Sequence, residues 1–471
     1  MNIRYILLLF VSLATMTVLP AEVAGGDAES QLPFDSIFSD ETLRLDYIFG
    51  GSIDSTGNPE VTILSDALVR VTGWAGRRSR LKELPLRGNG QITVCDKATG
   101  DTIYRNSFST LFQEWLSDSA ANSARDSMSG NHRAPRAFQN LFLVPMPRRA
   151  ADITVTLSDS YHRPMAEMTH TVDPSDILIH DLSKKPLTPH RYIHRGGDPK
   201  EVIDVAIMAE GYTVEEMDSF YCHAAIAVES IASHEPFKSS MDRFNFIAVA
   251  SPSVDTGVST PKDGNWKSTA VNSHFSTFYS DRYLTTNDNK AIHDHLAGIP
   301  YEHVIILANT DEYGGGGIFN LYTLTTARHK FFRPVVVHEF GHSFGGLADE
   351  YFYDDDPLST SSYPQGVEPW EPNITTLTDF SSKWEPLLTP GTPVPTLPAD
   401  SLLYPVGVYE GGGYLSKGVF RPADQCRMRN NTYPVFCPAC QAWLRRLIDF
   451  YTLPPSGKNR TCDRPIRSVT L

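Results

Sequence analysis

The chain has few cysteines, a deficit of basic residues and no long apolar run. Six cysteines among 471 residues are too few for a scaffold held together by disulfides. Lys and Arg number 41 against 55 Asp and Glu, and the resulting formal charge of -14 repels phosphate backbones, so we expect no nucleic-acid partner. Hydrophobic residues make up 41% of the chain, which permits a large core and excludes bulk disorder.

The N-terminus carries an apolar run from Tyr5 to Leu19, preceded by Arg4. A membrane-spanning helix needs roughly 20 apolar residues, so this run is short for an anchor. Small residues follow at Ala21 and Ala24, as they do at cleavage sites. The pattern predicts a signal peptide over residues 1–25 and an exported mature chain, whether secreted, periplasmic or at the cell surface, without stable membrane insertion.

Residues 26–173 show strand and turn patterns throughout. The segments Gln91–Cys95 and Thr102–Tyr104 flank a turn, and Ile153–Leu157 and Glu167–Val172 form a second pair of this kind. Short alternating strands at such spacing are typical of β-sandwiches. We therefore expect an all-β sandwich in this part of the chain.

The pattern changes after residues 174–200, a segment with several prolines and glycines that we expect to be a linker. Beyond it, Val202–Met208, Phe244–Ala250 and His303–Leu307 have the apolar composition of buried strands and alternate with helical spacing. This alternation predicts an α/β domain over residues 201–471. The predicted fold is thus a multidomain α+β chain with a β-sandwich followed by an α/β domain.

A predicted apolar helix within residues 331–346 carries His338, Glu339 and His342 in a His-Glu-x-x-His pattern. This spacing places both imidazoles on one helical face, where each can bind a zinc ion at about 2 Å. Glu339 points around the helix and can reach a water molecule, as a general base must. Two core histidines beside an unrelated glutamate are the alternative interpretation, which we consider much weaker.

A tetrahedral zinc site needs a third protein ligand. In metzincin peptidases this ligand follows a helix-ending glycine by three residues. Counting from Gly345 gives Ala348, which cannot bind metal, whereas counting from Gly346 gives Asp349. We therefore favour Asp349 as the third ligand and keep Glu350 as the second candidate.

Cysteines cluster near the C-terminus, and two of them form Cys437-Pro-Ala-Cys440. A C-x-x-C pair can serve redox chemistry or bind zinc, but no βαβ pattern adjoins this one. Cys426 and Cys462 are unevenly spaced for a zinc knuckle. Local disulfides or buried free thiols are the favoured interpretations, and the sequence leaves the disulfide state open.

The run His338–Tyr351, and later Tyr409–Pro422 with Cys426–Arg429, resemble the IgA peptidase family of secreted bacterial zinc metallopeptidases, a metzincin-like group. The resemblance implies a metzincin-like zinc peptidase domain behind an N-terminal β domain, with Zn2+ as cofactor. It also implies that Met428 lies in a turn beneath the metal. Tyr433 is a further candidate, as a phenol donor to a developing oxyanion.

These features predict an exported zinc endopeptidase that hydrolyses peptide bonds of extracellular proteins through metal-activated water. Glu339 would be the base, and His338, His342 and Asp349 the ligands. One alternative is a non-catalytic binding or adhesion protein on a peptidase scaffold, which the intact His-Glu-His set argues against. A second alternative is a zinc aminopeptidase, and the sequence does not distinguish it. The natural substrate and the role of the β domain also stay open.

Overall fold

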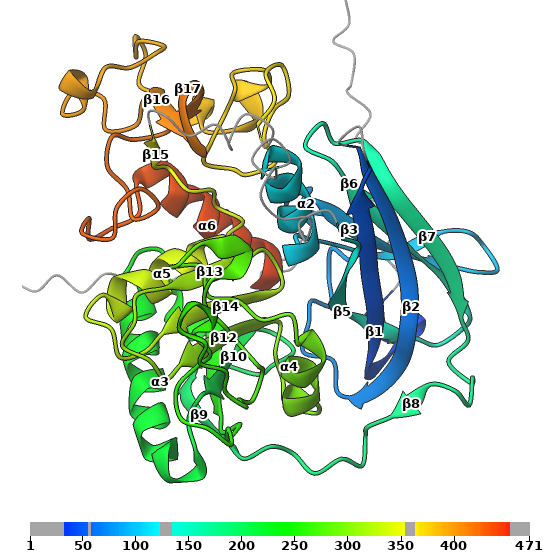
Figure 1. Cartoon of the computed structure of the whole chain (residues 1–471). Coiled ribbons are helices and arrows are strands. Elements are labelled where there is room, and N and C mark those ends of the chain that lie inside the picture. The colour runs from blue at the N-terminus through cyan, green and yellow to red at the C-terminus, as the bar shows by residue number, and fades with distance from the viewer. Residues whose placement is uncertain (1–32, 55–57, 123–133, 354–362, 453–471) are drawn as a thin grey trace, which may run out of the picture. The chain divides into compact units, whose positions relative to one another are not determined.

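The computed structural model describes residues 33–54, 58–122, 134–353 and 363–452. From Phe34 onward the chain forms one compact unit of mixed α and β structure with several sheets (Figure 1). The predicted signal peptide lies outside the described residues. Within the described ranges, no helix is both long and apolar enough to cross a membrane.

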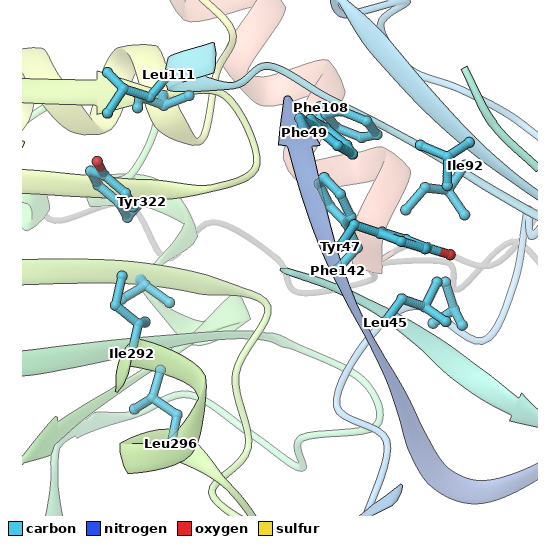
Figure 2. Close-up of a cluster of buried hydrophobic side chains, with 14 of the residues drawn as sticks. Leu45, Tyr47, Phe49, Ile92, Phe108, Leu111, Phe142, Ile292, Leu296 and Tyr322 are labelled. Atoms are coloured by element: carbon cyan, nitrogen blue, oxygen red, sulfur yellow. The ribbon is translucent and has the colours of Figure 1, made fainter. Parts of the chain in front are cut away.

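Two antiparallel four-stranded sheets dominate the N-terminal half (Figure 1). Aromatic side chains pack between them, with the rings of Phe108 and Phe142 4.1 Å apart and those of Phe49 and Phe108 6.4 Å apart (Figure 2). Both predicted hairpins form, as the pairs β3/β4 and β6/β7. The first sheet, in the order β5-β1-β2-β8, consists of β1 (Phe38–Ile53), β2 (Pro59–Thr72), β5 (Arg136–Pro147) and β8 (His180–Asp181), in which only the short β8 runs parallel to its neighbour. The second, in the order β4-β3-β6-β7, consists of β3 (Gly90–Asp96), β4 (Thr102–Phe108), β6 (Ala151–Ser158) and β7 (Pro164–Val172).

This half is not all-β, contrary to the prediction, because it contains the helix α2 (Leu111–Asn122) and the single turn α1 (Phe34–Ile37). The apolar residues Phe112 and Trp115 are three positions apart and buried, a helical rather than a strand spacing. The Phe112 ring packs edge-on against Phe49 of β1 at 6.1 Å. The helix thus covers one end of the β core.

A six-stranded sheet forms the centre of the C-terminal half, in the order β13-β14-β12-β10-β11-β9. Its four inner strands are parallel and its two edge strands are antiparallel to their neighbours. Every residue of the central strand β10 is buried, as expected for a parallel strand covered on both faces. The strands are β9 (His190–Arg195), β10 (Ile203–Glu210), β11 (Phe244–Val249), β12 (His303–Ala308), β13 (Gly315–Ile318) and β14 (Tyr322–Thr326). Strands β8 and β9 both fall within the segment expected to be a linker.

The two faces of β10 belong to different clusters of buried side chains. Val205 and Ile207 join a cluster with residues of α3 (Met217–Ala232), α5 (Phe332–Ser343) and α6 (Pro438–Thr452). Ala206 and Met208 join a cluster that also contains Ile292 and Leu296 of α4 (Asn289–Leu296) and residues of the N-terminal sheets. Figure 2 shows members of this second cluster from both halves of the chain. The two halves therefore share one core.

A third, three-stranded sheet lies beyond the predicted zinc helix, in the order β15-β17-β16. It consists of β15 (Phe352–Tyr353), β16 (Tyr409–Gly412) and β17 (Tyr414–Arg421). Short stretches of 3-10 helix connect the larger elements at Val214–Glu216, Lys238–Arg243, Pro261–Asp263, Thr277–Tyr279, Phe380–Ser382, Glu385–Leu387 and Pro398–Asp400.

Candidate active site and metal centre

The helix α5 carries the His-Glu-x-x-His residues and packs against β13, β14 and α3 (Figure 1). Its apolar residues Val336, Val337 and Phe340 are fully buried in the core with α3 and α6, which fixes the orientation of the helix. His338 and His342, one turn apart, lie with their ring centroids 4.7 Å from each other. The predicted helix and its two histidines are therefore placed as the spacing requires.

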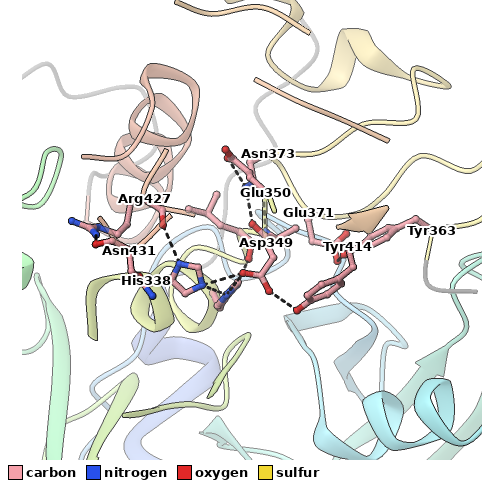
Figure 3. Close-up of polar contacts among 12 residues, drawn as sticks. His338, Asp349, Glu350, Tyr363, Glu371, Asn373, Tyr414, Arg427 and Asn431 are labelled. Carbon is pink, nitrogen blue, oxygen red and sulfur yellow. Dashed lines mark hydrogen bonds and ion pairs between the residues drawn. The ribbon is translucent and has the colours of Figure 1, made fainter. Parts of the chain in front are cut away.

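Asp349 joins the two imidazoles. Its Oδ1 lies 3.0 Å from His338 Nε2 and 3.3 Å from His342 Nε2. The two Nε2 atoms lie 3.1 Å from each other. Figure 3 shows His338 facing Asp349 across this short gap.

The remaining ring nitrogens determine which atoms of the histidines can bind a metal. His338 Nδ1 lies 3.0 Å from the carbonyl oxygen of Arg427, and His342 Nδ1 lies 2.5 Å from that of Leu347. Because a carbonyl only accepts, each Nδ1–H donates, and each neutral ring keeps its lone pair on Nε2. Two nitrogen lone pairs and one carboxylate oxygen thus converge on a single point.

The converging atoms fit a small cation. In a tetrahedral site with bonds of 2.0 to 2.1 Å, ligand atoms are separated by about 3.3 Å. The three observed separations, 3.0, 3.1 and 3.3 Å, lie close to this value. Two imidazoles and a carboxylate are also a donor set that suits zinc, with a fourth position open for water.

The histidines and Asp349 shift each other's pKa because their charges lie close together. Burial lowers the pKa of His342, but the Asp349 carboxylate more than compensates, so the pKa rises to about 9. Burial raises the pKa of Asp349, yet the two imidazoles outweigh it, and the pKa lies well below its ordinary value. The pocket therefore holds a negative charge that attracts a proton or a metal ion.

Gly346 explains why Asp349, and not Glu350, reaches the imidazoles. It ends α5 with a φ of 60°, a left-handed conformation that glycine adopts without strain. The chain then turns back, and Asp349 lies beside the histidines. Glu350 points elsewhere, with Oε1 accepting hydrogen bonds from Asn373 at 2.9 Å and from the Cys440 thiol at 3.2 Å (Figure 3).

Glu339 lies on the side of α5 that faces β13. A Cβ added to Gly315 of β13 would come within 2.8 Å of Glu339 Oε1, so the carboxylate lies directly against this glycine. Burial raises the pKa of Glu339, the two imidazoles lower it, and Asp349 raises it further, with a net increase. A carboxyl group with a raised pKa is better suited to accept and return a proton.

Met428 lies under the helix, as the resemblance implies. It is fully buried, and a Cβ added to Gly341, between the two histidines, would lie 2.7 Å from its Sδ. The Met428 carbonyl accepts a hydrogen bond from the Glu350 N–H at 2.9 Å, which ties this turn to the segment that carries Asp349.

Tyr414 is a site residue that the sequence analysis did not identify. Its hydroxyl donates a hydrogen bond to Asp349 Oδ2 (Figure 3), whereas the oxyanion role of Tyr433 stays a prediction. Tyr414 has a φ of 68°, unusual for a residue with a side chain, and follows Gly413, whose N–H donates to the Asp349 carbonyl at 2.8 Å. The path of the third sheet brings Tyr414 back to Asp349.

The N-terminal half also reaches this region. Glu114 of α2 accepts a hydrogen bond from the Tyr283 hydroxyl, and the Tyr283 backbone forms a β-bridge with Gly315. Burial raises the pKa of Glu114 to about 7 despite the Tyr283 hydrogen bond and the nearby His342. The strand that packs against Glu339 is therefore supported by a helix from the other half of the chain.

Family comparisons match both halves. Residues 192–403 match the family model described as IgA Peptidase M64, and residues 33–168 match that described as Peptidase M64 N-terminus. The first match includes α5, Asp349 and β15, and ends before β16, β17 and Met428. No curated protein matches the chain.

Proposed function

The chain belongs to the IgA peptidase M64 family and is therefore a peptidase, and we propose that it is an exported, zinc-dependent endopeptidase with a metzincin-like site. Its substrates are proteins or peptides, as for any peptidase. The convergence of His338 Nε2, His342 Nε2 and Asp349 Oδ1 within 3.3 Å carries the zinc assignment. Export is proposed from the short apolar run near the N-terminus.

His338, His342 and Asp349 would hold the metal. Zinc, when bound, lowers the pKa of a water molecule to about 7 and polarises the substrate carbonyl. The carbonyl oxygens of Arg427 and Leu347 fix the ring orientations through the two Nδ1–H donors. Tyr414 holds Asp349 through its second carboxylate oxygen.

Glu339 supplies the proton transfers. Its carboxylate, held between α5 and Gly315, accepts a proton from the attacking water as the oxygen bonds to the peptide carbonyl carbon. The same proton then passes to the amine nitrogen as the carbon–nitrogen bond breaks. A carboxyl group with a raised pKa suits this exchange, because it accepts a proton more readily than an ordinary glutamate.

Glu339→Gln tests the proposal. The amide keeps the size of the side chain but removes the base. Zinc content at this site should stay at about one ion per chain, while the rate of cleavage should fall at least about a hundredfold. Glu201→Gln, at an exposed position, is the matched control and should cleave like the parent. A Glu339→Gln protein that cleaves at the parent rate would overturn the assignment of the base.

Substrate type is tested with peptides whose N-terminus is blocked. An endopeptidase cleaves such peptides internally, whereas an aminopeptidase needs a free amine. Cleavage restricted to unblocked peptides would replace the endopeptidase proposal by the aminopeptidase alternative.

A further inference from the structure

A second cluster of metal-binding side chains lies behind Asp349. Glu350, Cys426, Cys437 and Cys440 each offer one atom, and these atoms all lie within 4.8 Å of one another. All four residues are buried, none more than 2% exposed. They come from three segments, namely the turn after α5, the Met428 turn and the start of α6.

The thiols and the carboxylate face each other directly. The Cys440 thiol donates to Glu350 Oε1 at 3.2 Å and lies 3.9 Å from Cys426 Sγ. The Cys437 N–H donates to Cys426 Sγ at 3.3 Å. The three cysteines also belong to the apolar cluster with Met428, so water does not compete for these atoms.

Glu350 is incompletely satisfied within this cluster. Its Oε1 accepts two hydrogen bonds, but its Oε2 is buried and has no hydrogen-bond partner in the described part of the chain. A buried carboxylate oxygen without a hydrogen bond destabilises the folded protein, because it has lost its contact with water. Arg421, the buried cation whose charge acts on Glu350, donates instead to the carbonyl oxygens of Glu410 and Gly411, each at 2.7 Å.

We propose that Glu350, Cys426, Cys437 and Cys440 bind a second zinc ion with a structural role. Three sulfur ligands favour a soft or borderline metal, and the C-x-x-C pair supplies two of them from one helical turn. Four protein ligands close the coordination shell, as in structural zinc sites. On binding, the three thiols release their protons to solvent, and the carboxylate uses the oxygen that lacks a partner.

This ion would connect the segments that shape the active site. Glu350 directly follows Asp349, and Cys426 directly precedes Arg427, whose carbonyl oxygen orients His338. Met428 follows one residue later. One ion bound to both segments and to α6 would fix the third catalytic ligand and the methionine turn relative to each other.

Zinc content in a His342→Ala background separates this site from the active site. Purified parent protein should contain about two zinc ions per chain, and His342→Ala about one. Adding Cys440→Ser to His342→Ala should remove most of the remaining zinc, whereas adding Cys222→Ser, a matched control at an exposed cysteine, should not. Zinc content below half an ion in His342→Ala alone would overturn the proposal, and this readout does not depend on peptidase activity.

Cobalt substitution and thiol counting keep the test decisive if Cys440→Ser does not fold. Cobalt bound by His342→Ala should show the charge-transfer absorption of cobalt thiolate bonds, which nitrogen and oxygen ligands do not produce. The three cluster thiols should resist a thiol reagent until a chelator is added. A disulfide among Cys426, Cys437 and Cys440, found by non-reducing mass spectrometry, or the absence of the cobalt thiolate band would overturn the proposal.

Discussion

Adjacent residues in this chain take unrelated roles, as Asp349 and Glu350 show. Asp349 faces the imidazoles, and Glu350 faces a thiol and an amide on the opposite side of the same segment. The sequence analysis selected both residues as candidates and favoured the one that the structure brings to the histidines. It could not place Tyr414, because the contact between Tyr414 and Asp349 spans 65 positions and has no local signal.

Tyr414→Phe should weaken the catalytic metal site without removing it. The variant loses the hydroxyl that donates to Asp349 Oδ2, and partners of this kind typically change metal affinity or activity by about 10- to 100-fold. Chelator competition measures the effect, with Tyr433→Phe as the matched control. Equal zinc affinity in Tyr414→Phe and the parent would contradict this positioning role.

Asp204, at the start of β10, should make stability depend on pH. Burial raises the pKa of Asp204 from 3.8 to about 7, although Asn245 donates to one oxygen at 2.8 Å. The folded protein keeps this proton up to about pH 7, whereas the unfolded chain releases it near the ordinary value. The free energy of unfolding therefore falls as pH rises from the ordinary value of 3.8 to about 7, by up to about 1.4 kcal/mol per pH unit.

Asp204→Asn removes the titration. The variant should become more stable relative to the parent from about pH 5 to pH 7. Urea denaturation should show this as an increasing difference between the free energy of unfolding of the variant and that of the parent. Asp218→Asn, at an exposed position in α3, should show no such trend. A parent-to-variant difference that does not change with pH would show that Asp204 titrates normally in the folded protein.

At the scale of elements, the strongest local sequence patterns correctly predicted individual helices, strands and hairpins. The helix with the two histidines, the buried strands β10, β11 and β12 and both N-terminal hairpins are present where the sequence indicated them. The helix α2 was missed because its apolar spacing extends over barely two turns in a region dominated by strand patterns. The pairing of β8 and β9 with distant strands has no signature within their own short segments.

The strand β13 packs closely against α5 because Gly317 has no side chain. A Cβ added to Gly317 would lie 2.4 Å from the Glu339 carbonyl oxygen and 2.8 Å from His342 Cβ. Gly317→Ala should therefore push the strand away from the helix, lower the free energy of unfolding by about 1 to 3 kcal/mol and reduce cleavage. Gly50→Ala in β1, whose nearest contact would be an ordinary 3.7 Å, is the matched control for thermal denaturation and activity. Similar results for the two variants would contradict the tight packing.

At the scale of the whole molecule, the two matched halves pack against each other through shared apolar contacts and hydrogen bonds. Hydrogen bonds join them at Ser109 N–H to the Phe319 carbonyl oxygen, 3.0 Å, and at Arg44 to Asp294, 2.6 Å. One cluster of buried apolar side chains spans both. Sequence patterns are local, so they could not show how the two predicted domains pack against each other.

Calorimetry should accordingly show a single unfolding transition for the full chain. Trp115→Ala in α2 removes a nearly fully buried side chain and should cost about 3 to 5 kcal/mol. Because the halves unfold together, thermal inactivation of the peptidase should shift downward with the calorimetric peak. Two peaks, only one of which moves, would contradict the shared core.

Because the halves share a core, we do not expect the N-terminal half to serve as a detachable pro-domain. An inhibitory pro-domain is cut away from a surface that is stable in water. Cutting away residues 34–173 would instead remove many of the apolar side chains of the shared cluster, and would remove Glu114 from beside Tyr283. We therefore expect a cut between the halves to destabilise the peptidase rather than to release an active C-terminal half.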